Sequence, residues 1–123
     1  MSLMVLRRGQ IWWVNLDPTV GSEIQKKRPC VIVSSDAATR LPLRIVVPLT
    51  HWNEGFSTSP FHVRVEADNA DAWEGVGLKK GGAADVMQVR CVSEDRFESY
   101  IALMSAEKME EIVAAIAAVI EYA

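Results

Sequence analysis

GSEIQKKRPCVIVSSDAATRLPLRIVVPLT, residues 21–50, joins a basic polar loop to two apolar runs with a short turn between them. Residues 29–33 are rich in β-branched side chains, which is typical of a buried strand. Residues 44–49 predict a second strand of the same kind. Arg28 lies where the first strand begins and Thr50 where the second ends. We therefore expect two neighbouring strands, each with one polar residue at its junction with a loop.

The length and composition of the chain predict one globular domain. Its 123 residues suffice for a real core without disulfides, and 50% hydrophobic with 24% charged residues is ordinary for such a protein. We expect a single domain over residues 1–123, with residues 1–6 as a tail. The apolar runs are too short to cross a bilayer, and no signal-peptide pattern is present. This predicts a cytoplasmic protein with no membrane association.

Charge is distributed unevenly along the chain. The net charge of −3 argues against a general nucleic-acid coat protein, because phosphate binding depends on Lys and Arg. Residues 1–50, however, carry a balance of +4, which leaves −7 for the remainder. A basic N-terminal half is therefore expected to face RNA locally while the acidic C-terminal part faces solvent.

The two cysteines lie within predicted strands. Cys30 and Cys91 each precede a valine and share no CxxC spacing. Such cysteines are usually small buried hydrophobes, so we expect neither a metal site nor a disulfide.

The rest of the chain predicts more strands and one long helix. Alternating side chains indicate strands at residues 10–16, 61–66 and 85–92, and a short extended piece at 100–103. The strand at 61–66 would turn His62 toward water. Ser105 can cap a helix over residues 106–122. Its apolar stripe comprises Met109, Ile112, Val113, Ile116, Val119 and Ile120. The order predicts a mostly β fold of antiparallel strands, a strongly bent sheet or barrel, with a terminal amphipathic helix on one side.

The chemistry available is restricted. The sequence has no Gly-rich phosphate loop, HExxH, zinc spacing or GxSxG elbow, so we expect neither a metal nor another cofactor. Cleavage of RNA by its own ribose 2′-hydroxyl needs only alignment and stabilisation of the extra phosphorane charge. An Arg beside a Thr hydroxyl is a plausible minimal set, because a guanidinium can grip two phosphate oxygens.

Several motifs in order resemble one family. These motifs are GQIWWVNLDPTVGSEIQKKRPCVIVSSD, VVPLT and VMQVRCVSEDRF, followed by the helix. Together they are similar to the MazF/PemK toxin endoribonucleases over nearly the whole chain from Arg8. The resemblance implies the SH3-like barrel shared with CcdB toxins, a homodimer, and an antitoxin partner whose acidic tail occupies the RNA groove. It also implies sequence-specific, metal-independent cutting of single-stranded messenger RNA to 2′,3′-cyclic phosphate and 5′-hydroxyl ends.

The resemblance also implies roles for individual residues. Arg28 matches the family's catalytic arginine, for phosphate stabilisation and proton transfer, although an ordinary Arg is a poor base. Thr50 matches the catalytic threonine, and Gln88 a position that shapes the site, with Arg90 a weaker candidate. The other candidates for RNA binding or site shaping come from the polar loop: Glu23, Lys26 and Lys27.

Two positions depart from the family pattern. Met87 stands where some members have an acidic residue that acts as a base. His51 follows Thr50 where many members have a small residue. An imidazole there is a candidate acid or base, and the competing interpretation is an ordinary loop histidine.

Two alternative functions are open at the level of sequence. One is a CcdB-like toxin that binds DNA gyrase and cuts nothing; such proteins lack the Arg-Pro and Pro-Leu-Thr pair found at Arg28 and Thr50. The other is a catalytically inactive member that acts as a binding module. The sequence does not define the RNA motif or the antitoxin, because base reading depends on loop side chains.

Overall fold

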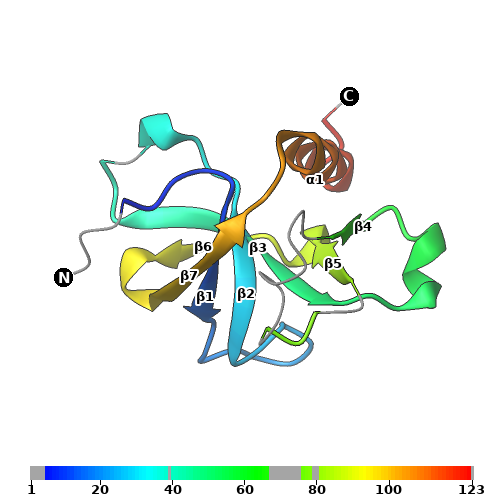
Figure 1. Ribbon diagram of the computed structural model, residues 1–123, viewed down its shortest axis with the longest axis horizontal. Helices are drawn as coiled ribbons and strands as arrows, with labels where there is room; N and C mark the ends of the chain where they lie inside the picture. Colours follow the sequence, from blue (N-terminus) through cyan, green and yellow to red (C-terminus); the bar gives the residue numbers. More distant parts are fainter. Residues whose placement is uncertain (1–4, 39, 67–75, 79–80, 123) are drawn as a thin grey trace.

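In the described part of the chain, the fold comprises seven strands and one C-terminal helix (Figure 1). The structure is a computed structural model that describes residues 5–38, 40–66, 76–78 and 81–122. The strands are β1 (Gln10–Asn15), β2 (Lys27–Ile32), β3 (Leu43–His51), β4 (His62–Val65), β5 (Gly82–Asp85), β6 (Arg90–Ser93) and β7 (Phe97–Leu103). The helix is α1 (Ala106–Val119), and 3₁₀ turns are η1 (Asp36–Ala38), η2 (Glu54–Thr58), η4 (Val86–Gln88) and η5 (Glu94–Arg96).

The strands form one antiparallel sheet in the order β4-β5-β3-β2-β1-β7, with β6 also paired to β3. The predicted class, mostly β with a terminal helix, is confirmed. The predicted barrel is open, because β4 and β7 end the strand order and do not pair within the described residues. Figure 1 shows β4 and β5 toward one end of the molecule and β1, β6 and β7 toward the other, with β2 and β3 between them.

One edge of β3 carries two different strands. Leu43–Val46 of β3 pair with β6, and Leu49–His51 pair with β5. Between Ala84, opposite Leu49, and Arg90, opposite Val46, the chain has three residues more than β3 offers, and they are coiled into η4. The predicted continuous strand at residues 85–92 is therefore wrong. Gln88 therefore lies in a 3₁₀ turn at the sheet edge and not in a strand.

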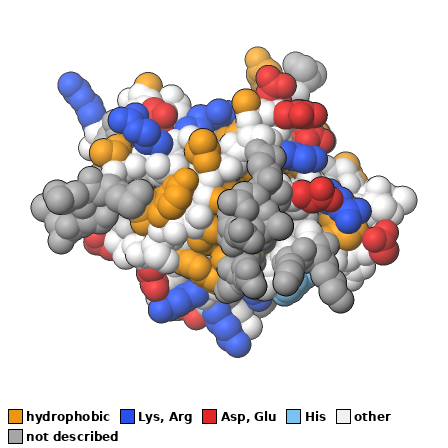
Figure 2. Space-filling model, in the orientation of Figure 1, with side chains coloured by type: hydrophobic (Ala, Val, Ile, Leu, Met, Phe, Trp, Pro, Cys, Tyr) orange, Lys and Arg blue, Asp and Glu red, His pale blue; other side chains and the backbone are white. Residues whose placement is uncertain are grey.

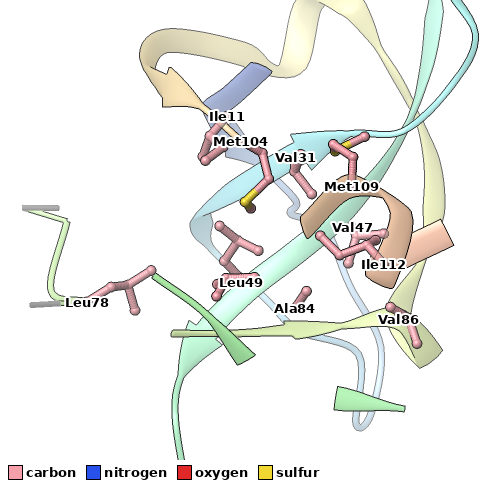
Figure 3. Close-up of a cluster of buried hydrophobic side chains, with 11 residues drawn as sticks. Ile11, Val31, Val47, Leu49, Leu78, Ala84, Val86, Met104, Met109 and Ile112 are labelled. Atoms are coloured by element: carbon pink, nitrogen blue, oxygen red, sulfur yellow. The ribbon is translucent and has the colours of Figure 1, made fainter. Parts of the chain in front are cut away.

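Two hydrophobic clusters cover opposite faces of the sheet. The first lies under α1 and contains Val31, Val47, Leu49, Ala84 and Ile112, with six further buried residues (Figure 3). The second contains Leu6, Trp12, Val14, Leu16, Cys30, Ile32, Val46 and Val92. Because neighbouring residues of a strand point to opposite faces, this division tells which face each strand residue occupies. Cys30 is buried as predicted, whereas Cys91 is exposed.

The helix begins where the sequence predicts. The Ser105 hydroxyl accepts a hydrogen bond from the Lys108 N–H at 3.2 Å, which caps the first turn. Met109 and Ile112 are buried against the sheet. Val113 is 39% exposed, so the predicted apolar stripe is narrower than expected. The helix ends at Val119, and Ile120 beyond it is 68% exposed.

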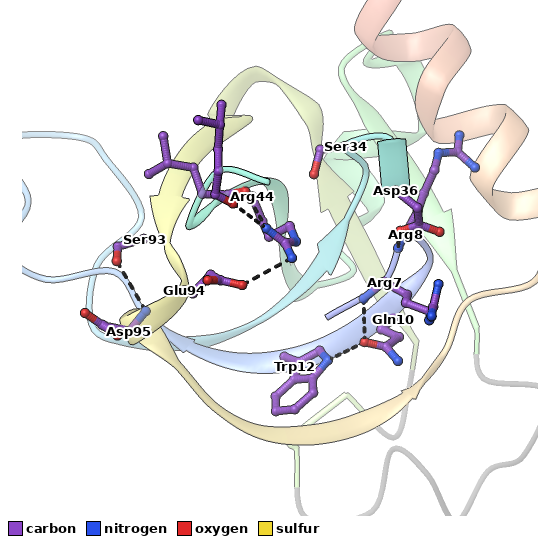
Figure 4. Close-up of polar contacts among 12 residues, drawn as sticks. Arg7, Arg8, Gln10, Trp12, Ser34, Asp36, Arg44, Ser93, Glu94 and Asp95 are labelled. Atoms are coloured by element: carbon purple, nitrogen blue, oxygen red, sulfur yellow. Dashed lines mark hydrogen bonds and ion pairs between the residues drawn. The ribbon is translucent and has the colours of Figure 1, made fainter. Parts of the chain in front are cut away.

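The segment near the N-terminus contributes to the core. Leu6 is buried in the second cluster, and the Arg8 N–H donates to Asp36 Oδ1 at 2.8 Å (Figure 4). Residues 1–4 of the predicted tail lie outside the described residues. Within the described part of the chain, no helix has the length and apolar character needed to cross a membrane.

Candidate active site

The register of β2 and β3 decides where Arg28 and Thr50 lie. The two strands pair antiparallel, with Cys30 opposite Pro48, Val31 opposite Val47 and Ile32 opposite Val46. The pairing ends with Cys30 and Pro48, and Arg28 and Thr50 are the residues that the same register aligns when it is continued by two positions. Residues opposite each other in an antiparallel pair have Cα atoms about 5 Å apart and share a face of the sheet. Both residues are partly exposed, so the pair lies at the surface rather than inside the protein.

Arg90 lies on the same face as this pair. It is opposite Val46, which belongs to the second cluster with Cys30. Burial raises the pKa of the Cys30 thiol to about 12, while the charges of Arg90 and Arg28 act in the opposite direction. Both guanidinium groups therefore lie near the same buried sulfur. Arg28 and Arg90 thus border the second cluster on the face of the sheet that carries Thr50.

Backbone carbonyls orient the two arginines. Arg28 Nε donates to the Gln25 carbonyl at 3.3 Å, and Arg90 Nη1 donates to the Leu16 carbonyl at 3.2 Å. A guanidinium has five N–H donors, and these bonds use one on each residue. Pro29 also holds Arg28 in extended geometry, because the residue before a proline is excluded from helical angles. Each arginine is thus positioned while most of its donors remain for an anionic ligand.

Gln88 connects η4 to the loop between β1 and β2. Its Oε1 accepts from the Ile24 N–H at 3.1 Å, and its Nε2 donates to the Ser22 carbonyl at 3.1 Å. The side chain thereby holds the loop that leads into Arg28. Its contacts are with the loop backbone, and the site-shaping role of Gln88 stays a prediction.

The other loop candidates have separate surroundings. Glu23 Oε1 accepts from the Val20 N–H at 2.7 Å and closes its own turn. Lys26 adopts a left-handed backbone, φ 68°, and its N–H donates to Asp17 Oδ1 at 2.9 Å. Lys27 points to the face opposite Arg28 and pairs with Glu98 at 2.8 Å. Of the two lysines, Lys27 therefore has an ion pair, and Lys26 has none among the described residues.

His51 is not brought to the Arg28 and Thr50 pair. It follows Thr50 in β3 and so points to the other face of the sheet. There it is opposite Gly82, and its Cε1 lies 3.6 Å from the place where a Cβ on Gly77 would be. The imidazole and the Thr50 hydroxyl therefore lie on different sides of β3.

The sequence analysis missed a group of residues beside this pair. Arg64 of β4 lies on the Thr50 face, and its guanidinium is 5.0 Å from the centroid of the Trp52 ring. His62 is 18% exposed and stacked on Phe56, so the prediction that it faces water was wrong. Alternation in residues 61–66 already placed His62 and Arg64 on one face, and only the pairing with β5 could show which face.

Charge is only partly divided as expected. Figure 2 shows basic side chains at the end of the molecule that carries the loop between β1 and β2 and at the upper left, with acidic side chains nearby and more of them around α1. A small antiparallel sheet with a C-terminal helix, and two arginines on the same face as a threonine, are features expected of the class of nucleic-acid-cleaving proteins that the sequence resembles.

Comparisons with known proteins give the family. The sequence profile of the PemK-like, MazF-like toxins of type II toxin-antitoxin systems matches residues 7–120. Endoribonuclease MazF9 of Mycobacterium tuberculosis is 32% identical over 114 residues, which cover 88% of this chain and 90% of that protein. Endoribonuclease PemK of Escherichia coli is 38% identical over 90 residues, 71% of this chain and 60% of PemK. The chain therefore belongs to the PemK/MazF family of toxins.

Solved structures agree on the fold. An endoribonuclease in complex with its cognate antitoxin from a mycobacterial species superposes with a TM-score of 0.74 at 20% identity, covering 97% of this chain and 98% of that one. The names of the relatives support the predicted endoribonuclease, and they give no support to the gyrase-binding alternative.

Proposed function

We propose that this protein is a toxin endoribonuclease that cuts single-stranded RNA, with Arg28 and Thr50 as its catalytic residues. The proposal is supported by the register of β2 and β3, which aligns these two residues on one partly exposed face when it is continued two positions beyond Cys30 and Pro48. The family and the names of the relatives support the reaction class.

The proposed reaction uses the substrate as its own nucleophile. The ribose 2′-oxygen forms a bond to phosphorus and loses its proton, while the bond from phosphorus to the 5′-oxygen breaks and that oxygen gains a proton. The products are a 2′,3′-cyclic phosphate and a 5′-hydroxyl, with no net consumption of water or of protons. The protein therefore has to align the groups and stabilise charge.

The residues divide this work by their chemistry. The guanidinium of Arg28 holds two phosphate oxygens and stabilises the charge that develops on the phosphorane. The Thr50 hydroxyl donates a hydrogen bond to one of these oxygens. Arg90, near the same buried thiol, adds a second positive charge to the surface that receives the phosphate.

Cleavage in the presence of EDTA tests the proposal. The purified protein should cut a mixed-sequence single-stranded RNA, and mapping of the new ends should find cyclic phosphates and 5′-hydroxyls. Thr50→Val keeps the shape of the side chain and removes the hydroxyl, so it should slow cutting. An unaltered protein that leaves the RNA intact, or cutting that EDTA abolishes, would contradict the proposal.

We also propose an antitoxin partner that binds this surface. The solved relative contains a cognate antitoxin, and the basic end of the molecule suits an acidic segment of a partner. Such a segment would compete with RNA for Arg28 and Arg90. Because the proposed substrate is messenger RNA, the cytoplasm is the expected place of action.

A homodimer is the proposed assembly. Leu43 and Ile45 of β3 are each 42% exposed, and Ile45 is opposite the exposed Cys91 of β6. These residues share the face that α1 covers farther along β3, so they leave apolar surface beside the helix. Ile45→Asp should lower the molar mass measured by light scattering from that of a dimer to that of a monomer. An unchanged mass would remove this surface from the proposed interface.

A further inference from the structure

The sheet extends the Arg28 and Thr50 pair into a longer row. Thr50 is opposite Ala83 of β5, and Ala83 is opposite Arg64 of β4. Residues paired in this way share a face, so the side chains of Arg28, Thr50, Ala83 and Arg64 cross four neighbouring strands on one side of the sheet. With strands about 4.8 Å apart, Arg64 lies about 10 Å from Thr50 along this row.

Arg64 is stacked on an aromatic residue that follows β3. Its guanidinium lies 5.0 Å from the centroid of the Trp52 ring, and Trp52 Nε1 donates to Glu54 Oε1 at 3.2 Å. Phe56 contacts the Trp52 ring edge to face, with 5.9 Å between centroids. The indole is thus held from several sides, and the planar cation above it has a defined position.

A second layer fixes this group to the sheet. Phe56 stacks on His62 with ring centroids 3.8 Å apart and 4° between their planes. Ser59 Oγ lies 2.7 Å from His62 Nδ1, and Asp85 Oδ2 lies 3.8 Å from His62 Nε2. The contacts from Trp52 through Phe56 to His62 tie the loop after β3 to β4 and β5, so the position of Trp52 is built into the fold.

The outer part of this group is available to a ligand. The Arg64 side chain is 48% exposed, and its pair with Glu66 at 3.5 Å is also exposed, which makes it weak. Ala83, between Thr50 and Arg64, is fully buried, so the surface between these two residues is formed by neighbouring groups that cover its methyl. A half-exposed planar cation on an indole is the kind of surface on which unstacked bases pack.

We propose that Trp52 and Arg64 form a nucleobase-stacking subsite for a nucleotide that flanks the scissile phosphate. The inference rests on the proposed function, because it takes Arg28 and Thr50 as the position of that phosphate. Single-stranded RNA is the ligand that matches the whole row: phosphate at Arg28, ribose and phosphate oxygens at Thr50, and a base at Arg64. The subsite binds substrate and takes no part in bond breaking.

Steady-state kinetics on a mixed-sequence single-stranded RNA separate binding from chemistry. Arg64→Ala and Trp52→Ala should each raise KM about tenfold, the loss expected for one stacked base, and leave kcat nearly unchanged. Arg64→Lys keeps the charge but lacks the planar group, so it should behave like Arg64→Ala. Arg40→Ala is the matched control. It removes an exposed arginine that precedes the N-terminal end of β3, and it should leave KM and kcat unchanged.

Fluorescence gives a readout that does not require cutting. In the Thr50→Val protein, titration with the same RNA should quench tryptophan emission, and Trp52→Phe in that background should remove most of the change. Trp52→Phe and Arg64→Lys are mild substitutions, so they keep the test valid if Trp52→Ala is poorly folded.

The possible outcomes separate the stacking subsite from the proposed RNA cleavage. RNA that is cut and bound equally well by the Trp52 and Arg64 variants would overturn the subsite and leave the nuclease intact. Full rescue by Arg64→Lys would also overturn stacking, since charge alone would then suffice. An unaltered protein that neither binds nor cuts RNA would overturn the proposed function and the subsite together.

Discussion

Gln88 Oε1 accepts a hydrogen bond of 3.1 Å from the N–H of Ile24, a residue 64 positions earlier in the chain. The same side chain donates to the Ser22 carbonyl, so one residue binds two points of the loop that precedes Arg28. The position of this loop therefore depends on η4, a turn on a different part of the sheet.

Gln88→Ala should loosen the loop without unfolding the protein. Two partly exposed hydrogen bonds are lost, at about 1 kcal/mol each. Trypsin should therefore cut after Lys26 or Lys27 faster than in the unaltered protein, as followed by mass spectrometry. Met87→Ala, in the same turn and 61% exposed, is the control. Equal digestion rates for the two variants would show that the hydrogen bonds do not restrain the loop.

Arg28→Ala should reduce kcat/KM for RNA cleavage about a hundredfold or more, because it removes a charge clamp from the transition state. Arg28→Lys should recover only part of the loss, since an ammonium cannot hold two phosphate oxygens in one plane. Initial rates on a fluorescent RNA measure both. Cleavage that persists in Arg28→Ala would remove this residue from the mechanism.

His51→Ala should leave the dependence of the cleavage rate on pH unchanged between about pH 5 and 8, the range in which a histidine changes charge. The reason is geometric: the imidazole points away from the Thr50 face. Rates measured across this range for both proteins provide the check. Loss of one limb of the profile in the variant would make His51 an acid or base after all.

Cys30 should make the protein less stable in alkali. Burial raises the pKa of its thiol from 9.0 to about 12, so between these values the unfolded thiol ionises while the folded one keeps its proton. Unfolding then releases a proton, and the free energy of unfolding falls as pH rises, by up to about 1.4 kcal/mol per pH unit. Denaturant titrations at several pH values give the free energy of unfolding as a function of pH. This free energy should fall less steeply with pH for Cys30→Ala than for the unaltered protein. Parallel slopes would contradict the shift.

Arg44→Leu should lower the free energy of unfolding by about 2 kcal/mol. The side chain is 5% exposed, donates to the Leu41 and Leu43 carbonyls at 3.0 and 2.8 Å, and pairs with Glu94 at 3.2 Å (Figure 4). Glu94→Gln should cost less than 1 kcal/mol, because Glu94 is 41% exposed. Urea titrations measure the free energy of unfolding of both variants. Similar losses would show that Arg44 stabilises the protein through its ion pair with Glu94 rather than through its hydrogen bonds to the carbonyls.

Local patterns were sufficient for most of the fold. Alternation found β1 and β4, β-branched runs found β2 and β3, and the Ser105 cap located the start of α1. The break at η4 was missed because residues 86–92 continue to alternate. Its cause is a mismatch in length against β3, some 40 residues earlier in the chain, which no local pattern contains.

The candidate site was predictable in part for the same reason. Arg28 and Thr50 end adjacent strands, so their proximity follows from a hairpin-like order that the sequence displays. Trp52 directly follows β3, but Arg64 reaches it only through β5, which joins the sheet from a later segment. The position of Arg64 depends on the register of three strands, and that register is set by packing rather than by local sequence.

The three surplus residues of η4 mark a place where a change of length would leave both ladders in register, provided that the buried Val86 keeps its place in the core. The ladders on either side of the turn are anchored separately to β3, so an insertion or deletion between them shifts neither. What would change is the reach of the side chain at position 88 and hence the shape of the loop before Arg28. Evolution could therefore retune the substrate preference of such a toxin by altering one turn, while the framework that holds the reacting groups is inherited intact.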